Sequence, residues 1–100
     1  MPEATHYTQL TRARLDERAW EEAFYALTAL KGVLQSLPGF VGMELLGRAE
    51  AEVELVIIVR WALEEQLAAW LRGGETPAAV LAQLEPAPKE LSTQALLELG

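Results

Sequence analysis

The run from Val53 to Val59 constrains the fold more than any other part of the sequence. It reads Val-Glu-Leu-Val-Ile-Ile-Val, so apolar and largely β-branched residues occupy both phases of a two-residue repeat. Such a strand belongs at the centre of a sheet, covered on both faces. We therefore expect a central strand over 52–61, paired as a hairpin with a strand from Phe40 to about Arg48.

The segment before this hairpin predicts a strand followed by a long helix. Residues 5–15 alternate loosely, with Tyr7, Gln9, Thr11 and Ala13 on one face, as in a strand. Asp16 then offers a carboxylate to the free amides of a helix start. The helix should bury an apolar stripe and end at Pro38-Gly39. The residues of this stripe are Trp20, Ala23, Phe24, Leu27, Leu30, Leu34 and Leu37.

The segment after the hairpin predicts two helical pieces and a last strand. A shorter amphipathic helix over 63–71 ends at Gly73-Gly74, although Ala62 stands where a capping side chain would be expected. Thr76-Pro77 starts another helical piece. Residues 91–99 alternate as a final strand.

The predicted order is strand, helix, strand, strand, helix, strand, which is the α+β ferredoxin-like βαββαβ pattern within one domain, 1–100. In that fold both main helices lie on one face of an antiparallel four-stranded sheet. The other face still carries apolar residues, and a chain of 100 residues leaves nothing to cover it. We expect a homodimer in which two sheets pack face to face.

Composition excludes several classes of function. There is no cysteine, so disulfides, thiolate metal sites and a cysteine nucleophile are absent. The net charge is -7 with scattered arginines, which argues against nucleic acid as a partner. No apolar run reaches the length of a membrane span, and no signal peptide is visible. We expect a cytoplasmic protein without a metal site.

Three stretches carry a resemblance to a known family. They are Leu-Pro-Gly-Phe-Val-Gly-Met-Glu-Leu-Leu at 37–46, Val-Ile-Ile-Val-Arg-Trp at 56–61 and Ala-Trp-Leu-Arg at 69–72. With this spacing the chain resembles the antibiotic biosynthesis monooxygenase (ABM) family, whose members are dimeric α/β barrels. The resemblance implies oxidation of aromatic compounds without a cofactor in some members, haem breakdown in others, and no established activity in many.

The resemblance also implies a pocket between the sheet and the helices. Its lining residues would be Tyr7, Gln9, Phe24, Trp61 and Trp70. In the haem-degrading branch Trp70 would match a tryptophan and Gln9 would fall near an asparagine, but Val80 stands where the histidine would be. Valine cannot ligate iron, so haem degradation would require His6 to substitute.

Each candidate also has a structural interpretation. Trp61 and Trp70 can pack in the core, and Trp20 and Phe24 belong to the helix stripe. His6 is the one side chain that ordinarily titrates near neutral pH and hence a candidate base, yet it can equally be a surface histidine. Gln9 would need hydrogen-bond partners if buried.

Two charged residues within strands also have two interpretations. Glu44 and Glu54 can form structural ion pairs with Arg60 or Arg12 across the sheet, or act as an acid and base couple. We favour the ion pairs.

Two functions remain open. The first is a small dimeric monooxygenase acting on an aromatic or quinone-type compound without metal or flavin, with Gln9 or His6 holding or removing a phenolic proton. The alternative is a non-catalytic dimer that binds a small apolar ligand or serves as an accessory protein. An apolar pocket without convergent polar groups would favour the alternative.

Overall fold

The computed structural model describes residues 4–49, 52–74 and 76–99. Their order of elements confirms the predicted βαββαβ pattern with an extra helical turn before the last strand. The elements are β1 (Ala4–Asp16), the 3-10 turn η1 (Glu17–Ala19), α1 (Trp20–Leu34), β2 (Phe40–Ala49), β3 (Glu52–Trp61), α2 (Glu64–Gly73), α3 (Pro77–Leu81) and β4 (Glu90–Leu99).

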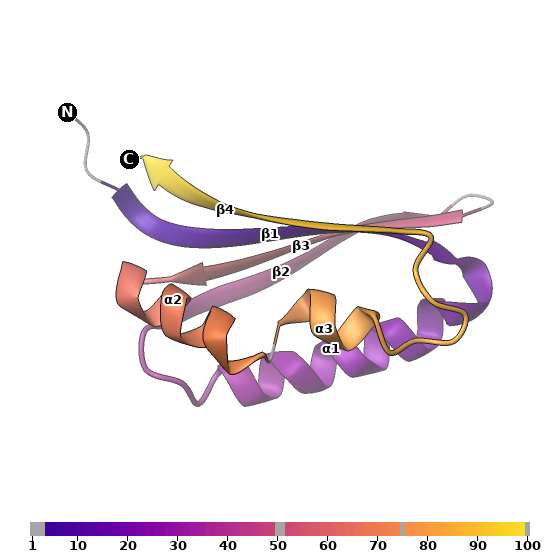
Figure 1. Ribbon diagram of the computed structural model, residues 1–100, viewed down its shortest axis with the longest axis horizontal. Coiled ribbons are helices and arrows are strands. Elements are labelled where there is room, and N and C mark those ends of the chain that lie inside the picture. Colours follow the sequence, from indigo (N-terminus) through magenta and orange to yellow (C-terminus); the bar gives the residue numbers. More distant parts are fainter. Residues whose placement is uncertain (1–3, 50–51, 75, 100) are drawn as a thin grey trace.

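The four strands form one antiparallel sheet in the order β2-β3-β1-β4, so β3 is central as predicted. The three α-helices all lie on one side of the sheet, and the described chain leaves the other side open (Figure 1). This is the α+β ferredoxin-like fold. We call the two sides the helix face and the open face.

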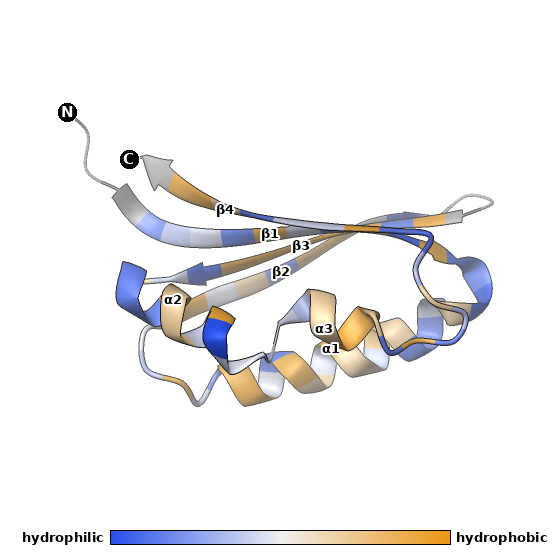
Figure 2. Cartoon of the chain, viewed as in Figure 1, coloured by the Kyte–Doolittle hydropathy of each residue, from blue (hydrophilic) through white to orange (hydrophobic). Residues whose placement is uncertain are grey.

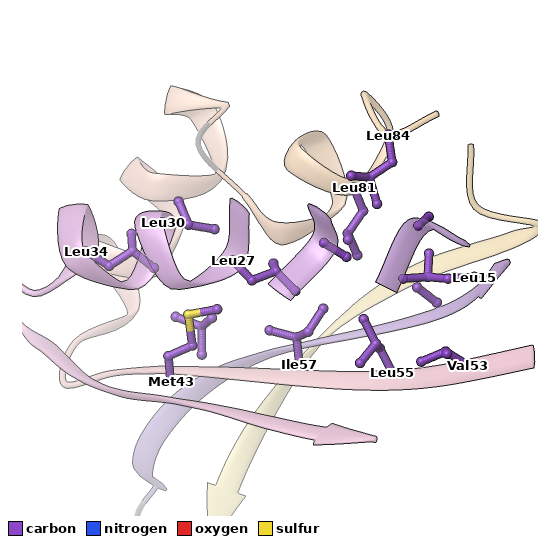
Figure 3. Close-up of a cluster of buried hydrophobic side chains, with 14 of the residues drawn as sticks. Leu15, Leu27, Leu30, Leu34, Met43, Val53, Leu55, Ile57, Leu81 and Leu84 are labelled. Atoms are coloured by element: carbon purple, nitrogen blue, oxygen red, sulfur yellow. The ribbon is translucent and has the colours of Figure 1, made fainter. Parts of the chain in front are cut away.

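The core lies between the helix face and α1. Val53, Leu55, Ile57 and Val59 alternate along β3 and are buried. Figure 3 shows Met43, Leu55 and Ile57 pointing toward leucines of α1 and α3. The two-residue repeat of a strand and the three- to four-residue repeat of a helix thus bring their apolar sides together.

The expectation that β3 is buried on both sides is only half right. Val56 and Ile58, which alternate with the core residues, are half-buried because no helix of the described chain covers the open face. In Figure 2 hydrophobic colour runs along β3 as well as along the helices beneath it.

The predicted stripe of α1 is wrong at its first turns. Trp20 is 38% exposed and Phe24 is 46% exposed, whereas Ala19 and Ala23 are buried. The two alanines let the start of the helix approach the sheet closely, which leaves no room for rings on that side. The aromatic rings instead contact each other on the outer surface, with 6.0 Å between the ring centroids of Trp20 and Phe24.

Three helix ends follow the predicted chemistry, but α1 ends at Leu34, before the predicted Pro38-Gly39. Asp16 accepts a hydrogen bond from the backbone N–H of Arg18 at 2.9 Å, so it caps η1 rather than α1 directly. Gly74 ends α2 with a positive φ of 78°. Thr76 caps α3 by accepting from the Ala79 N–H at 3.2 Å.

The start of α2 differs from the prediction. Leu63, not Ala62, is the first flanking residue, and its backbone N–H donates to Oε1 of Gln66 at 3.1 Å. A glutamine three residues into the helix can reach back in this way, so the helix start is capped without a serine or aspartate.

The open face carries an ordered row of charges at one end. Arg48 donates to Glu54 at 2.6 Å, and Arg14 lies 3.6 Å from Glu54 and 3.2 Å from Glu90. The hydrogen bond from Arg48 and the nearby charge of Arg14 hold the pKa of the Glu54 carboxyl below its ordinary value. Four side chains from four strands therefore alternate in sign across the sheet.

A second ion pair on this face confirms one predicted pairing. Arg60 donates to Oε1 of Glu44 at 2.8 Å. The expectation that Arg12 pairs with Glu44 or Glu54 is not met, because Glu54 is bound by Arg48 and Arg14 instead.

β4 is the least covered strand. From Glu90 to Leu97 every residue is exposed, including Leu91 and Leu97 on the helix face. The helix layer thus covers β2, β3 and β1 but stops short of β4. Among the described residues, no helix is long and apolar enough to cross a membrane.

Candidate functional site

An apolar groove opens where α2 meets the connection between α1 and β2. It has a volume of about 260 Å³ and lies at the end of β3. Four of its residues share one side of α2 because they are spaced by three or four positions. The lining residues are Leu37, Pro38, Trp61, Gln66, Ala69, Trp70 and Gly73.

Two tryptophans form the inner wall of the groove. Trp61 and Trp70 are nearly fully buried, and their ring centroids are 5.3 Å apart with the planes at 43°. Phe40 supports Trp61 from the other side, edge to face, with the centroids 5.8 Å apart. Flat aromatic walls of this kind favour a planar, apolar ligand.

Gln66 supplies the polar group of the groove. Its Oε1 is occupied by the N–H of Leu63, and its amide lies directly against Gly39. The hydrogen bond fixes which end of the amide is the acceptor. The Nε2 end, which has no bond to any described residue, is left as a donor in the groove wall.

Within the described chain, three unpaired polar atoms lie on the helix face of the sheet, the face that carries Trp61. Gln9 is 4% exposed and Thr11 is fully buried on the helix face of β1, and neither Gln9 Oε1 nor Thr11 Oγ1 finds a partner among the described residues. The same holds for Nε1 of Trp61. Unpaired buried polar atoms are costly and mark places where a ligand or water would be satisfied.

The structure brings together some of the residues that the sequence singled out and separates others. Tyr7 is the direct cross-strand partner of Trp61, and Gln9 follows two positions along the same face. Trp61, Trp70, Tyr7 and Gln9 therefore belong to one region, although Tyr7 and Gln9 do not line the groove itself.

His6 and Phe24 lie elsewhere. His6 alternates with Tyr7 and so points to the open face, where it borders a shallow hollow with Glu44 and Arg60. Phe24 lies on the outer surface of α1 beside Trp20 and Tyr25. Neither side chain lines the groove.

No group of three or more histidine, aspartate or glutamate side chains within residues 4–49, 52–74 and 76–99 is placed to hold a metal ion. Among the described residues, none that lines the groove is charged, so its electrostatics come from the Gln66 amide and the tryptophan rings. This arrangement can bind a flat apolar compound and donate a hydrogen bond to an oxygen on it.

Sequence reasoning missed Gln66 and the residues at the groove mouth. The signal was present, since positions 66, 69, 70 and 73 share one side of a helix. The helical spacing could not show which residues face this side of α2. These are Leu37 and Pro38, about thirty positions earlier in the chain.

Comparison with solved structures supports the fold. A conserved protein from Methanosarcina mazei Go1 is 12% identical with a TM-score of 0.75, covering 95% of this chain and 94% of that one. Rv0793 from Mycobacterium tuberculosis is 19% identical with a TM-score of 0.73, covering 95% and 96%. SnoaB, a cofactor-independent oxygenase from Streptomyces nogalater, is 20% identical with a TM-score of 0.69, covering 97% and 94%.

No curated protein sequence matches this one. The family model described as antibiotic biosynthesis monooxygenase, however, matches residues 7–88. That span includes β1 from Tyr7 onward, the hairpin, the three α-helices and every lining residue of the groove. The chain therefore belongs to the antibiotic biosynthesis monooxygenase family.

Proposed function

We propose that the protein is a small monooxygenase that binds an aromatic or quinone-type compound in the Trp61–Trp70 groove and oxidises it without metal or flavin. The observation that carries this proposal is an apolar groove walled by two tryptophans with one oriented amide donor. The groove volume of about 260 Å³ is slightly below the usual range of ligand pockets, about 300–1,000 Å³, which favours a compound of few rings. Membership of the family and the likeness to SnoaB support monooxygenase chemistry in general.

The reaction needs no outside reductant if the substrate carries an acidic carbon beside a phenol or ketone. Loss of a proton gives a carbanion that transfers electrons to dioxygen. An anthrone-like CH₂ then becomes C=O, one oxygen atom enters the product, and the other leaves as water with the two hydrogens. The protein's task is to hold the ring, exclude water and stabilise the negative oxygen of the deprotonated substrate.

Named residues take these tasks. Trp61 and Trp70 hold the ring face, and Nε2 of Gln66 donates to the phenolic or quinone oxygen. Gln9 does not line the groove, so its unpaired Oε1 is the acceptor available for an ordered water that would link it to a substrate hydroxyl. Tyr7 packs beside Trp61. His6 and Phe24 line no part of the groove, so the proposal assigns them no contact with the substrate.

The test is oxygen uptake with a panel of anthrone-like phenols. We expect one dioxygen consumed per substrate, unaffected by a metal chelator, and loss of most activity in Trp70→Ala and Gln66→Leu. Thr28→Ala, on the outer surface of α1 where Thr28 donates only to Phe24 O, is the matched control and should keep full activity. Absence of uptake with every compound would refute the proposal.

The alternative, a non-catalytic ligand-binding protein, is favoured by one observation. No described side chain that titrates near neutral pH lines the groove, so this part of the chain offers no general base there. Under this alternative the same phenols would quench tryptophan fluorescence but would be recovered unchanged. Haem titration tests the haem-degrading branch, which predicts a Soret shift.

We also infer a homodimer through the open face. The half-buried Leu10, Val56 and Ile58, together with the exposed Leu46 and Leu96, form an apolar surface that the described chain does not cover. A second copy of the chain can cover this surface with its own open face, because the subunits of a twofold dimer meet through the same surface. Light scattering at micromolar concentration should give twice the chain mass.

A chain without cysteine also fits a cytoplasmic location.

A further inference from the structure

We propose that the two subunits meet with their twofold axis along an apolar diagonal of the open face, so that Arg12 of each subunit pairs with the partner subunit's Glu44. The inference rests on the homodimer proposed above and adds its register. It depends on the strand register, on the charges of the open face and on the symmetry of a dimer.

The apolar diagonal follows directly from the register of the sheet. Leu46 is level with Val56, Ile58 is level with Leu10, and Leu96 is level with Thr8. The first three steps along this series move to the next strand or to the next level, and the last step, from Leu10 to Leu96, does both. The side chains therefore form an oblique apolar line from β2 to β4. Its members are Leu46, Val56, Ile58, Leu10 and Leu96.

Arg12 stands out among the charged side chains beside this diagonal. Arg14, Arg48 and Arg60 all have carboxylate partners within the subunit. Arg12 has no ion pair with any described residue, although it lies between Val56 and Ser92 near the middle of the face. An unpaired guanidinium covered by an apolar partner would be costly, so a dimer through this face needs a carboxylate opposite Arg12.

Glu44 is the carboxylate that symmetry places there. In a twofold pair of facing sheets, each residue lies opposite the partner residue found at its mirror position across the axis. Arg12 and Glu44 are two strands and one level apart, and the midpoint between them falls between Val56 and Ile58. An axis along the diagonal therefore brings them into opposition.

A second pair of residues obeys the same relation. Gln94 and Arg60 are also two strands and one level apart, in the same direction, and their midpoint lies beside Leu10 on the diagonal. One axis therefore matches both pairs. Arg60 already holds Oε1 of Glu44 at 2.8 Å, which leaves Oε2 of Glu44 for the arginine that arrives from the partner.

An axis moved from the diagonal to Arg12 fails on charge. An axis through Arg12 would place two unpaired guanidinium groups face to face, which is unfavourable. Facing sheets lie about 10 Å apart, a gap that an arginine and a glutamate reaching from opposite sides can span. The diagonal is thus the axis that buries the apolar residues and also pairs Arg12.

The test is a charge exchange followed by sedimentation equilibrium on the full chain. Arg12→Glu alone and Glu44→Arg alone should each raise the dimer Kd at least about tenfold, and the double variant should return it to within about threefold of the wild type. Arg72→Glu makes the same charge change on the exposed side of α2 and should leave Kd unchanged. Circular dichroism checks that every variant is folded.

Ile58→Asp tests whether the open face is the dimer interface, independently of the pairing of Arg12 with Glu44. The variant places a carboxylate on the apolar diagonal and should abolish the dimer. If Ile58→Asp dissociates the dimer and Arg12→Glu does not, the register is wrong. Failure of the double variant to restore the dimer, or a wild type that sediments as a monomer, also overturns the proposal. None of these readouts uses oxygen uptake, so failure of the proposed activity and failure of this register are distinguishable.

Discussion

The side-chain amide of Gln66 rests on the backbone of Gly39, where a β-carbon would overlap all three amide atoms. Gly39 also has a positive φ of 82°, and its carbonyl accepts from the Ala62 N–H at 2.9 Å. The start of β2, the end of β3 and the first turn of α2 are thus joined at one glycine. The groove is built on this junction.

Gly39→Ala should therefore be severely destabilising. Left-handed strain costs about 1–2 kcal/mol, and displacement of the Gln66 amide adds the loss of the α2 cap, about 1 kcal/mol. Urea unfolding measures the total. Gly32→Ala is the control, since Gly32 lies within α1 with nothing near its missing β-carbon, and it should stabilise by about 0.5–1 kcal/mol. Equal stability of Gly39→Ala and the wild type would contradict this account.

Gln66→Glu should separate the two tasks of this side chain. A carboxylate still accepts the Leu63 N–H and suits the positive end of the helix dipole, so the free energy of unfolding should change by less than about 0.5 kcal/mol. The donor in the groove is lost and a negative charge faces the substrate oxygen. We expect kcat/KM to fall by about 10²-fold, as when one oxyanion donor is removed. Activity near that of the wild type would remove Gln66 from the mechanism.

Gln9→Met should stabilise the protein and reduce its activity. The change removes a buried amide oxygen that has no partner among the described residues and replaces it with an apolar chain of similar length, for a gain of about 1 kcal/mol in the free energy of unfolding. Thr11→Val removes a similarly unpaired hydroxyl on the same face and should stabilise too, but with full activity. Thermal melts and oxygen uptake on both variants check this. Destabilisation by Gln9→Met would mean that the amide is satisfied in solution.

Asp16 should contribute to the acid sensitivity of the fold. Hydrogen bonds from the side chain and backbone of Arg18 lower the pKa of Asp16 from 3.8 to about 2. Because the folded pKa is the lower one, the stabilisation is complete above pH 3.8 and is lost as the pH falls toward about 2. Asp16→Asn should flatten the decline of Tm over this interval, whereas Glu17→Gln should not. An unchanged profile in Asp16→Asn would contradict the assignment.

Sequence patterns were sufficient for the order and type of the elements. The apolar run in both phases of β3 identified the central strand, and Gly73-Gly74 marked the end of α2. Pro38-Gly39 marked the turn into β2, although α1 itself already ends at Leu34. These signals are local, since they depend on backbone geometry and on the period of the side chains. The family resemblance carried by 37–46 and 56–61 is confirmed by the family match.

The phase of α1 could not be predicted in the same way. Trp20, Phe24 and Leu27 have helical spacing, but so do Ala19, Ala23 and Leu27, and periodicity alone does not choose between them. The choice depends on how closely the helix approaches the sheet. That distance is a tertiary property, and it selects the alanines.

The groove escaped prediction for a related reason. Its tryptophans were singled out, but Gln66 acquired its role through contact with Gly39, which lies far away in sequence. Phe24 was predicted to line the pocket because the buried side of α1 was assigned incorrectly, and it is exposed instead. The sequence thus identified the two tryptophans of the groove and missed Gln66.

The exposure of β4 has a consequence for local unfolding of the protein. This strand bonds to β1 along one edge and is exposed on both faces from Glu90 to Leu97, so local opening there disrupts few apolar contacts. Its backbone amides should therefore take up deuterium sooner than those of β3 when the chain is dilute. If deuterium uptake by the β4 amides slows as the protein concentration rises, the exchange rate of β4 reports on association of the chain.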